Sequence, residues 1–221
     1  MKVLIYWLFI LLLLLSACKK DDEPGTSFLA GIYDDSMNYR EINPGLQISF
    51  KYDSLLNVNY GKDSLDINLD GSYDIIISQR NLLGNPTENT NRNNTYPYMM
   101  LGVKNGVEVA IKNECFIIGH GQYSTISWVD TIAYKTNVAG ITNWSESNRI
   151  VYMWVEPPSI FRPSNGPWYN LANTERYVAF RMGINSQYRY GWIKFIVASH
   201  EKITVISYAL EKKIGNSDSK Y

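Results

Sequence analysis

The sequence lacks an excess of charge of either sign, because 21 Lys and Arg residues balance 21 Asp and Glu residues. Nucleic-acid-binding domains carry a basic patch or a high positive charge, so this balance disfavours a nucleic acid as partner. No stretch has a convincing helical period. With 45% hydrophobic and 14% aromatic residues, the chain leaves no room for extensive disorder and is long enough to form one sizeable core.

Cysteines are also few, and no hydrophobic run is long enough to span a bilayer comfortably. The longest such run, Val3 to Leu15, matches the hydrophobic region of a secretory signal. It ends in Leu15-Ser16-Ala17-Cys18, which resembles the lipobox of bacterial lipoproteins. The resemblance implies that residues 1–17 are removed and that Cys18 is acylated with diacylglycerol and palmitate, which would hold the chain on a membrane. An ordinary signal peptide beside an incidental cysteine is the alternative.

Residues 18–26 are predicted to form a short charged tether ahead of a domain that covers residues 27–221. Its acids, Asp21, Asp22 and Glu23, resemble the export tag that sends lipoproteins to the outer surface of some Gram-negative bacteria. The resemblance implies an outer-membrane protein that faces the cell exterior, and a plain solvated linker is the alternative. Once Cys18 is acylated, Cys115 has no partner for an internal disulfide.

The domain is predicted to be all-β, a single antiparallel β-sandwich of jelly-roll or immunoglobulin-like type. Short runs of apolar residues, some of them alternating with polar ones, follow one another between frequent turn signals. Residues 99–111 predict one hairpin with a type I′ turn at Asn105-Gly106, and residues 189–211 predict another around residues 199–202. Further strands are expected over residues 47–52, 73–78 and 149–155.

The last part of the chain carries a second resemblance. Residues 177–181, 190–193 and 208–211 are similar to the C-terminal strands of a loose group of secreted bacterial β-sandwich proteins, mostly uncharacterised, many of which have a DxNxDGxxD loop upstream. The resemblance implies a fold and an exported status, and it implies no activity. Cross-strand packing is a sufficient explanation for the Tyr and Trp residues of these strands.

The strongest candidate site is the stretch from Asp66 to Asp74, whose side-chain oxygens fall at loop positions 1, 3, 5 and 9. A hard cation such as Ca²⁺ takes six to eight oxygen ligands, and glycine at position 6 allows a sharp bend. The stretch resembles the calcium loops of FG-GAP/VCBS and thrombospondin type 3 repeats. This resemblance implies side-chain ligands from Asp66, Asn68, Asp70 and Asp74 and a carbonyl ligand from Ser72.

Two departures from these calcium loops limit the resemblance. Leu69 stands where glycine is usual, and Ile77 stands where an EF-hand carries its bidentate glutamate. The second departure argues against a regulatory EF-hand. An acidic, polar β-turn that binds no metal is the alternative interpretation of the stretch.

Two polar segments, residues 84–96 and 159–173, interrupt the strand pattern, and the second contains Phe161, Trp168 and Tyr169. Exposed aromatic rings on the rim of a sandwich stack against the C–H face of sugars, so these three residues are candidate glycan ligands. In the alternative interpretation the same rings fold back and cap the open end of the sandwich.

A catalytic site is not predicted. Cys115 and His120 are five residues apart, which places their side chains on opposite faces of a strand, and Glu156 would need a second carboxylate to act as a glycosidase. His200 falls in the turn predicted at residues 199–202. The protein is therefore expected not to be an enzyme.

Four Asp-(Ser/Thr)-apolar triplets resemble the acceptor motif for O-glycosylation of exported proteins in some Gram-negative bacteria. They begin at Asp35, Asp53, Asp63 and Asp130. Strand starts also favour an acidic turn residue followed by serine or threonine and an apolar residue, so both interpretations stay open.

The sequence thus predicts a surface-anchored lipoprotein that acts as a binding or adhesion module, for a glycan or a surface protein, and that is stabilised by a structural Ca²⁺ ion. A structural component of a cell-surface assembly without small-ligand binding is the alternative. A glycoside hydrolase is less favoured.

Overall fold

The structure is a computed structural model that describes residues 28–49, 51–53, 58–83, 95–104, 106–117, 123–146, 149–155, 166–169, 171, 173–184, 187–199 and 202–212. Within these ranges the regular elements are all strands. They are β1 (Met37–Ser49), β2 (Lys51–Asp53), β3 (Val58–Leu65), β4 (Ile75–Leu83), β5 (Thr95–Val103), β6 (Val107–Val109), β7 (Ile111–Ile117), β8 (Tyr123–Val129), β9 (Ile150–Val155), β10 (Thr174–Ile184), β11 (Gln187–Ser199) and β12 (Lys202–Glu211). The described ranges contain no helix long and apolar enough to cross a membrane.

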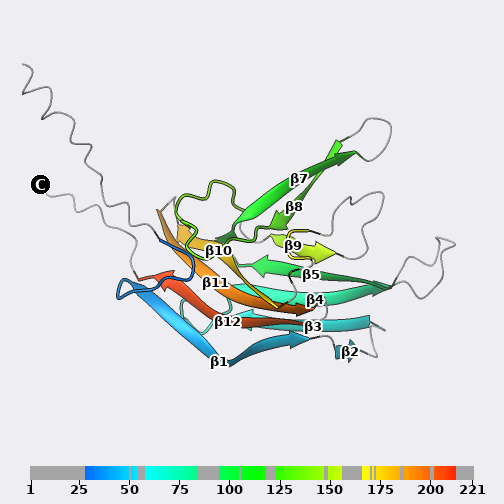
Figure 1. Cartoon of the computed structure of the whole chain (residues 1–221), viewed down its shortest axis with the longest axis horizontal. Coiled ribbons are helices and arrows are strands. Elements are labelled where there is room, and N and C mark those ends of the chain that lie inside the picture. Colours follow the sequence, from blue (N-terminus) through cyan, green and yellow to red (C-terminus); the bar gives the residue numbers. More distant parts are fainter. Residues whose placement is uncertain are drawn as a thin grey trace, which may run out of the picture.

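The strands form two sheets that pack face to face, so the predicted all-β sandwich is confirmed (Figure 1). One sheet has five strands in the order β1-β12-β11-β10-β6, and the other has seven in the order β2-β3-β4-β5-β9-β8-β7. The strand pairings are antiparallel except for a single parallel bridge between Trp128 of β8 and Tyr152 of β9.

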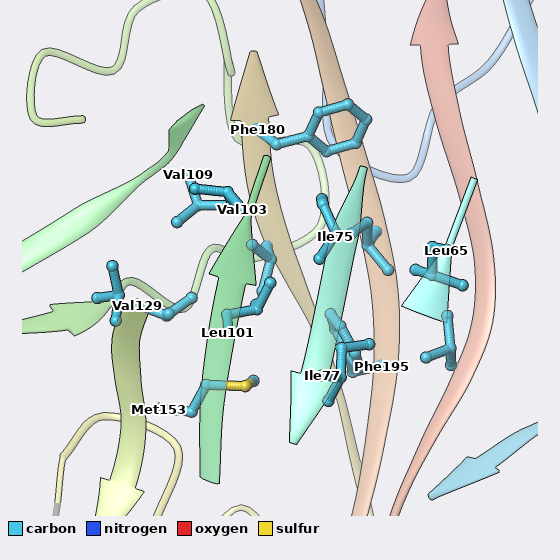
Figure 2. Close-up of a cluster of buried hydrophobic side chains, with 14 of the residues drawn as sticks. Leu65, Ile75, Ile77, Leu101, Val103, Val109, Val129, Met153, Phe180 and Phe195 are labelled. Carbon is cyan, nitrogen blue, oxygen red and sulfur yellow. The ribbon is translucent and has the colours of Figure 1, made fainter. Parts of the chain in front are cut away.

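The main core lies between the sheets and follows from the period of two in each strand. In β10, for example, Val178, Phe180 and Met182 face the core, while Tyr177 and Ala179 face away from it. Figure 2 shows how side chains from both sheets meet, with Phe180 and Phe195 of the five-stranded sheet opposite residues of the seven-stranded sheet. Burial of these apolar side chains is the main source of stability for the sandwich.

The outer face of the five-stranded sheet is also covered. Residues around Phe28 and Val138 pack on Tyr177, Ala179 and Trp192 and form a second, smaller core. The covering segments are tied together by backbone hydrogen bonds, since the N–H of Val138 donates to the carbonyl of Phe28 at 2.7 Å. The segment that begins at Phe28, the first described residue, is therefore part of the layer that covers the outer face of the five-stranded sheet.

The predicted hairpin over residues 99–111 is wrong. Gly106 does adopt a positive φ of 82°, as a turn at this position requires, but the two flanking strands belong to different sheets. β5 pairs with β4 and β9, whereas β6 pairs with β10. The turn therefore carries the chain from one sheet to the other, where Val107 and Val109 are buried in the main core.

The other expected strands are found with small shifts. β11 and β12 form the predicted closing hairpin, in which Trp192 lies opposite Ala209. The expected strand over residues 149–155 corresponds to β9, and the one expected at residue 73 begins at Ile75. Residues 47–52 are divided between the end of β1 and the start of β2.

Candidate functional site

The acidic loop, residues 66–74, joins β3 to β4 at one end of the seven-stranded sheet. It is also fastened to the opposite sheet, because the hydroxyl of Tyr208 in β12 donates a hydrogen bond to the carbonyl oxygen of Asp66 at 3.1 Å. Tyr208 itself belongs to the main core. The position of the loop is thus fixed by both layers of the sandwich.

The acidic side chains of the loop accept hydrogen bonds from the loop's own backbone. Asp66 accepts the N–H of Asp70 on Oδ1 at 3.2 Å and the N–H of Gly71 on Oδ2 at 2.8 Å. The side-chain oxygen of Asn68 accepts the same Asp70 N–H at 2.9 Å. Asp70 accepts the N–H of Ser72 at 2.8 Å and the side-chain N–H of Asn68 at 3.1 Å. Oxygens from loop positions 1 and 3 therefore converge on one backbone amide.

Two residues of the loop have left-handed backbone conformations, Leu69 with φ of 62° and Gly71 with φ of 86°. Glycine adopts such angles freely, whereas leucine does so at a cost of roughly 1–2 kcal/mol. Leu69 is held there by the hydrogen bonds of Asp66 and Asn68 to the next residue, and its side chain is exposed. Leu69, the residue that departs from the calcium-loop pattern, therefore adopts the left-handed backbone conformation that glycine would favour.

Asp74 has a different role from the other acids of the loop. Its side chain is only 2% exposed, and Oδ2 accepts the N–H groups of Ile67 at 2.9 Å and Asn68 at 3.3 Å. Its own N–H donates to the carbonyl of Leu65, and its carbonyl accepts the N–H of Lys104. Asp74 thus closes the base of the loop from inside and links it to the end of β5.

The other acids of the loop affect the pKa of Asp74. Burial raises the pKa of the Asp74 carboxyl above its usual range, and the charges of Asp70 and Asp66 raise it further, against the lowering effect of its two backbone donors. Asp70 lies in solvent, and there the N–H of Ser72 and the side chain of Asn68 lower its pKa. Ionisation is therefore less favourable for Asp74 than for Asp70.

The loop brings the predicted oxygen ligands onto one turn without placing all of its carboxylates together. In the described part of the chain, no group of three His, Cys, Asp or Glu side chains is placed so that it could hold a metal ion. A cation bound here would take the side-chain oxygens of Asp66, Asn68 and Asp70 and the carbonyl of Ser72, while Asp74 accepts backbone amides. Such a mixed, all-oxygen set is the kind that Ca²⁺ accepts.

Trp168 is not an exposed ring. Its side chain is 1% exposed, its Nε1–H donates to the carbonyl of Val129 in β8 at 2.9 Å, and its ring meets Phe195 of β11 edge-on with centroids 5.6 Å apart. It therefore lies between the two sheets, as the capping alternative predicts. Tyr169 is half-buried against the main core. Phe161 lies outside the described residues.

Cys115, the cysteine considered for catalysis, is exposed on β7, and its Sγ lies 3.4 Å from the hydroxyl oxygen of Thr125. His120, Glu156 and His200 lie outside the described residues. Among the possible glycosylation acceptors, Ser36 and Ser64 are exposed, Thr131 is half-buried, and Ser54 lies outside the described residues.

The sequence did not single out an exposed group of aromatic residues on the outer face of the five-stranded sheet. Tyr33 stacks on Tyr39 with ring centroids 3.8 Å apart and an interplanar angle of 5°. Tyr134 lies beside Tyr177, with centroids 6.4 Å apart. These residues come from two covering segments and two strands, so no periodic signal in the sequence connects them. No family model, curated protein or solved structure matches this chain.

Proposed function

We propose that this protein is a surface-anchored lipoprotein that acts as a binding or adhesion module, with Cys18 as its lipid anchor and the acidic loop as a stabilising Ca²⁺ site. The acidic loop carries this proposal: Asp66, Asn68 and Asp70 turn their oxygens onto a single tight bend that both sheets hold in place. A stabilising ion at such a bend suits a domain that works outside the cell without an internal disulfide.

Calcium binding is tested by thermal unfolding of the mature protein in EGTA and in about 10 mM Ca²⁺. Extracellular sites bind calcium with Kd values of about 0.1–1 mM. The ion would then add about 1.4–2.7 kcal/mol to the free energy of unfolding, or about 3–10 °C to the Tm of a domain of this size. An equal Tm in both solutions would leave the loop as an acidic turn.

A matched pair of variants separates the ion site from the turn itself. Asp70→Ala should abolish the rise in Tm with calcium. Asp34→Ala is the control, because Asp34 accepts the N–H of Ser36 at 2.8 Å just as Asp70 accepts the N–H of Ser72, and both aspartates lie in solvent. The control should lose a similar turn and keep the full response to calcium. A lost response in both variants would contradict a site at the loop.

The proposed anchor and location are tested in cells. Cys18→Ala should abolish acylation, and replacement of Asp21, Asp22 and Glu23 should retain the protein on the inner leaflet. Protease added to intact cells should degrade the wild-type protein and spare this second variant. Full protection of the wild type would show that it does not face the exterior.

A structural component of a surface assembly, without a small ligand, is the second candidate. It is favoured by the burial of Trp168, which removes one of three rings from the predicted glycan-binding rim. A glycan array probed with the mature protein distinguishes the two candidates. Saturable binding to defined glycans supports the binding module, and an array without hits leaves protein partners.

A further inference from the structure

Three exposed or half-buried tyrosines and two lysines lie on the outer face of the five-stranded sheet, around the buried rings of Tyr177 and Trp192. This tyrosine patch consists of Tyr33, Tyr39, Tyr134, Lys135 and Lys194. Tyr33 and Tyr134 are 56% and 55% exposed, although each ring packs against another tyrosine. The patch thus leaves large aromatic surfaces in solvent at fixed positions.

Sheet register explains why these residues meet. Tyr39, Ala209, Trp192 and Ala179 lie in one row across β1, β12, β11 and β10, with their side chains facing outward. Lys194 lies opposite Tyr177 in the next outward row, where its ammonium pairs with Glu175 at 2.8 Å. The small alanines of the first row, Ala209 and Ala179, are buried in the second core beneath the covering segments.

The patch is also joined to the place where the chain enters the domain. The N–H of Lys135 donates to the carbonyl of Ala30 at 2.8 Å, and the Lys135 ammonium lies 5.4 Å from the centre of the Tyr134 ring. Phe28, the first described residue, is buried in the same cover. A chain tethered ahead of Phe28 is therefore tethered from the side of the molecule that carries the patch.

The length of that tether limits how far the patch can lie from a membrane. Nine residues lie between Cys18 and Phe28, which makes ten steps along the chain. Fully extended, they reach about 33–36 Å, and as a flexible chain they span roughly 16–19 Å on average. An acylated Cys18 would thus present the patch to the bilayer at an effective concentration of about millimolar, so that even weak contacts would be populated.

We propose that the tyrosine patch rests on the bilayer interface to which Cys18 anchors the chain. The inference rests on the proposed lipid anchor. Tyrosine is suited to this position because its ring is apolar and its hydroxyl is polar, and lysine stems lie along apolar surface while their ammonium groups stay in water. The outer face of the seven-stranded sheet, with Ile150 60% exposed, then faces away from the membrane.

The charges around the patch predict how this contact responds to salt. Lys135, Lys194 and Lys212 are at least balanced by acids, namely Asp34, Asp35, Glu175 and Glu41, the last in the same outward row as Lys194. Attraction to anionic lipids would need a surplus of positive charge. The contact should therefore change less than twofold between 50 and 500 mM salt and between zwitterionic and anionic vesicles.

The first test uses the acylated mature protein in phosphatidylcholine vesicles, with Cys115→Ser and one new cysteine labelled with an environment-sensitive fluorophore. Tyr134→Cys should place the label where iodide quenches it several-fold less than on Ile150→Cys, the matched control on the opposite face. Lipid-borne quenchers should show the reverse order. Equal quenching of both labels in both experiments would overturn the inference.

The second test does not depend on acylation. The mature chain with Cys18→Ala is mixed with vesicles at millimolar lipid, and partition is measured by sedimentation. The double variant Tyr33→Ser, Tyr134→Ser should bind to the vesicles about tenfold less than the wild type. The control double variant Tyr73→Ser, Ile150→Ser removes equally exposed residues elsewhere and should bind as the wild type does. If acylation fails in cells but this difference is found, only the anchor is wrong.

Two results of the second test would overturn the membrane contact. One is equal partition of the two double variants, or no partition of the wild type. The other is binding that requires glycolipid in the vesicles and is competed by the soluble oligosaccharide, which would make the patch a sugar platform instead.

Discussion

Replacement of Trp168 tests whether the segment that interrupts the strand pattern is part of the core. Trp168→Ala removes a buried indole from between the sheets, together with its edge-on contact to Phe195 and its hydrogen bond to the Val129 carbonyl. Buried tryptophan-to-alanine changes cost about 3–5 kcal/mol. For a domain of this size that corresponds to a fall in Tm of about 6–20 °C.

A second substitution separates the apolar contact from the hydrogen bond. Trp168→Phe keeps a ring against Phe195 and leaves the Val129 carbonyl without its donor, which should cost about 1–3 kcal/mol. Tyr73→Ala is the control, because this ring is exposed and its loss should change stability by about 0.5 kcal/mol or less.

Urea unfolding of the mature protein, followed by circular dichroism, measures these differences as shifts of the midpoint at constant slope. A loss below about 1 kcal/mol for Trp168→Ala would refute the placement of this ring in the core. A larger loss has a practical result for binding studies: failure of this variant to bind a glycan would report unfolding rather than a lost contact.

Two further predictions concern a close approach in the core and the buried acid of the loop. Gly191→Ala should cost about 1–3 kcal/mol, because a Cβ there would overlap the Phe180 ring, whereas Gly102→Ala, whose Cβ would lie 3.8 Å from the nearest atom, should be tolerated in the same urea assay. The pKa of Asp74 is raised in the folded protein, so the folded state binds the Asp74 proton more tightly than the unfolded state does. The protonated carboxyl therefore contributes most to stability below the unfolded pKa of about 3.9. This contribution is lost as the pH rises through the folded pKa. In EGTA, Asp74→Asn should therefore gain stability relative to wild type between pH 4 and pH 7, by about 1.4 kcal/mol per unit of pKa shift, and a difference that stays constant over this range would count against the assignment.

The fold class followed from the sequence because strand periodicity is local. The closing hairpin β11–β12 was predictable, since two alternating runs flank a short polar turn and each strand finds its partner next in the chain. The turn at Gly106 shows the limit of this reasoning. Its residues specify a positive φ, which is a local property, but the partner of Val107 is Met182, 75 residues later in the chain.

The candidate site could be predicted in part for the same reason. The spacing of Asp66, Asn68 and Asp70 describes a turn whose side chains bond its own backbone, and the structure has that turn. The burial of Asp74 depends on Lys104 and the end of β5, which no local pattern includes. The tyrosine patch could not be predicted from the sequence at all, because its residues come from four separate segments of the chain.

The end of β12 lies against the segment that leads into β1, since the N–H of Lys212 donates to the Ser36 carbonyl at 2.9 Å and its ammonium to the Asp35 carbonyl at 2.6 Å. This arrangement matters to anyone who would use the protein as a display scaffold. A cargo fused directly after Lys212, the last described residue, would start beside Asp35 and Ser36. Cargo inserted between Leu83 and Thr95 would instead follow the end of β4, a strand whose nine residues span about 30 Å.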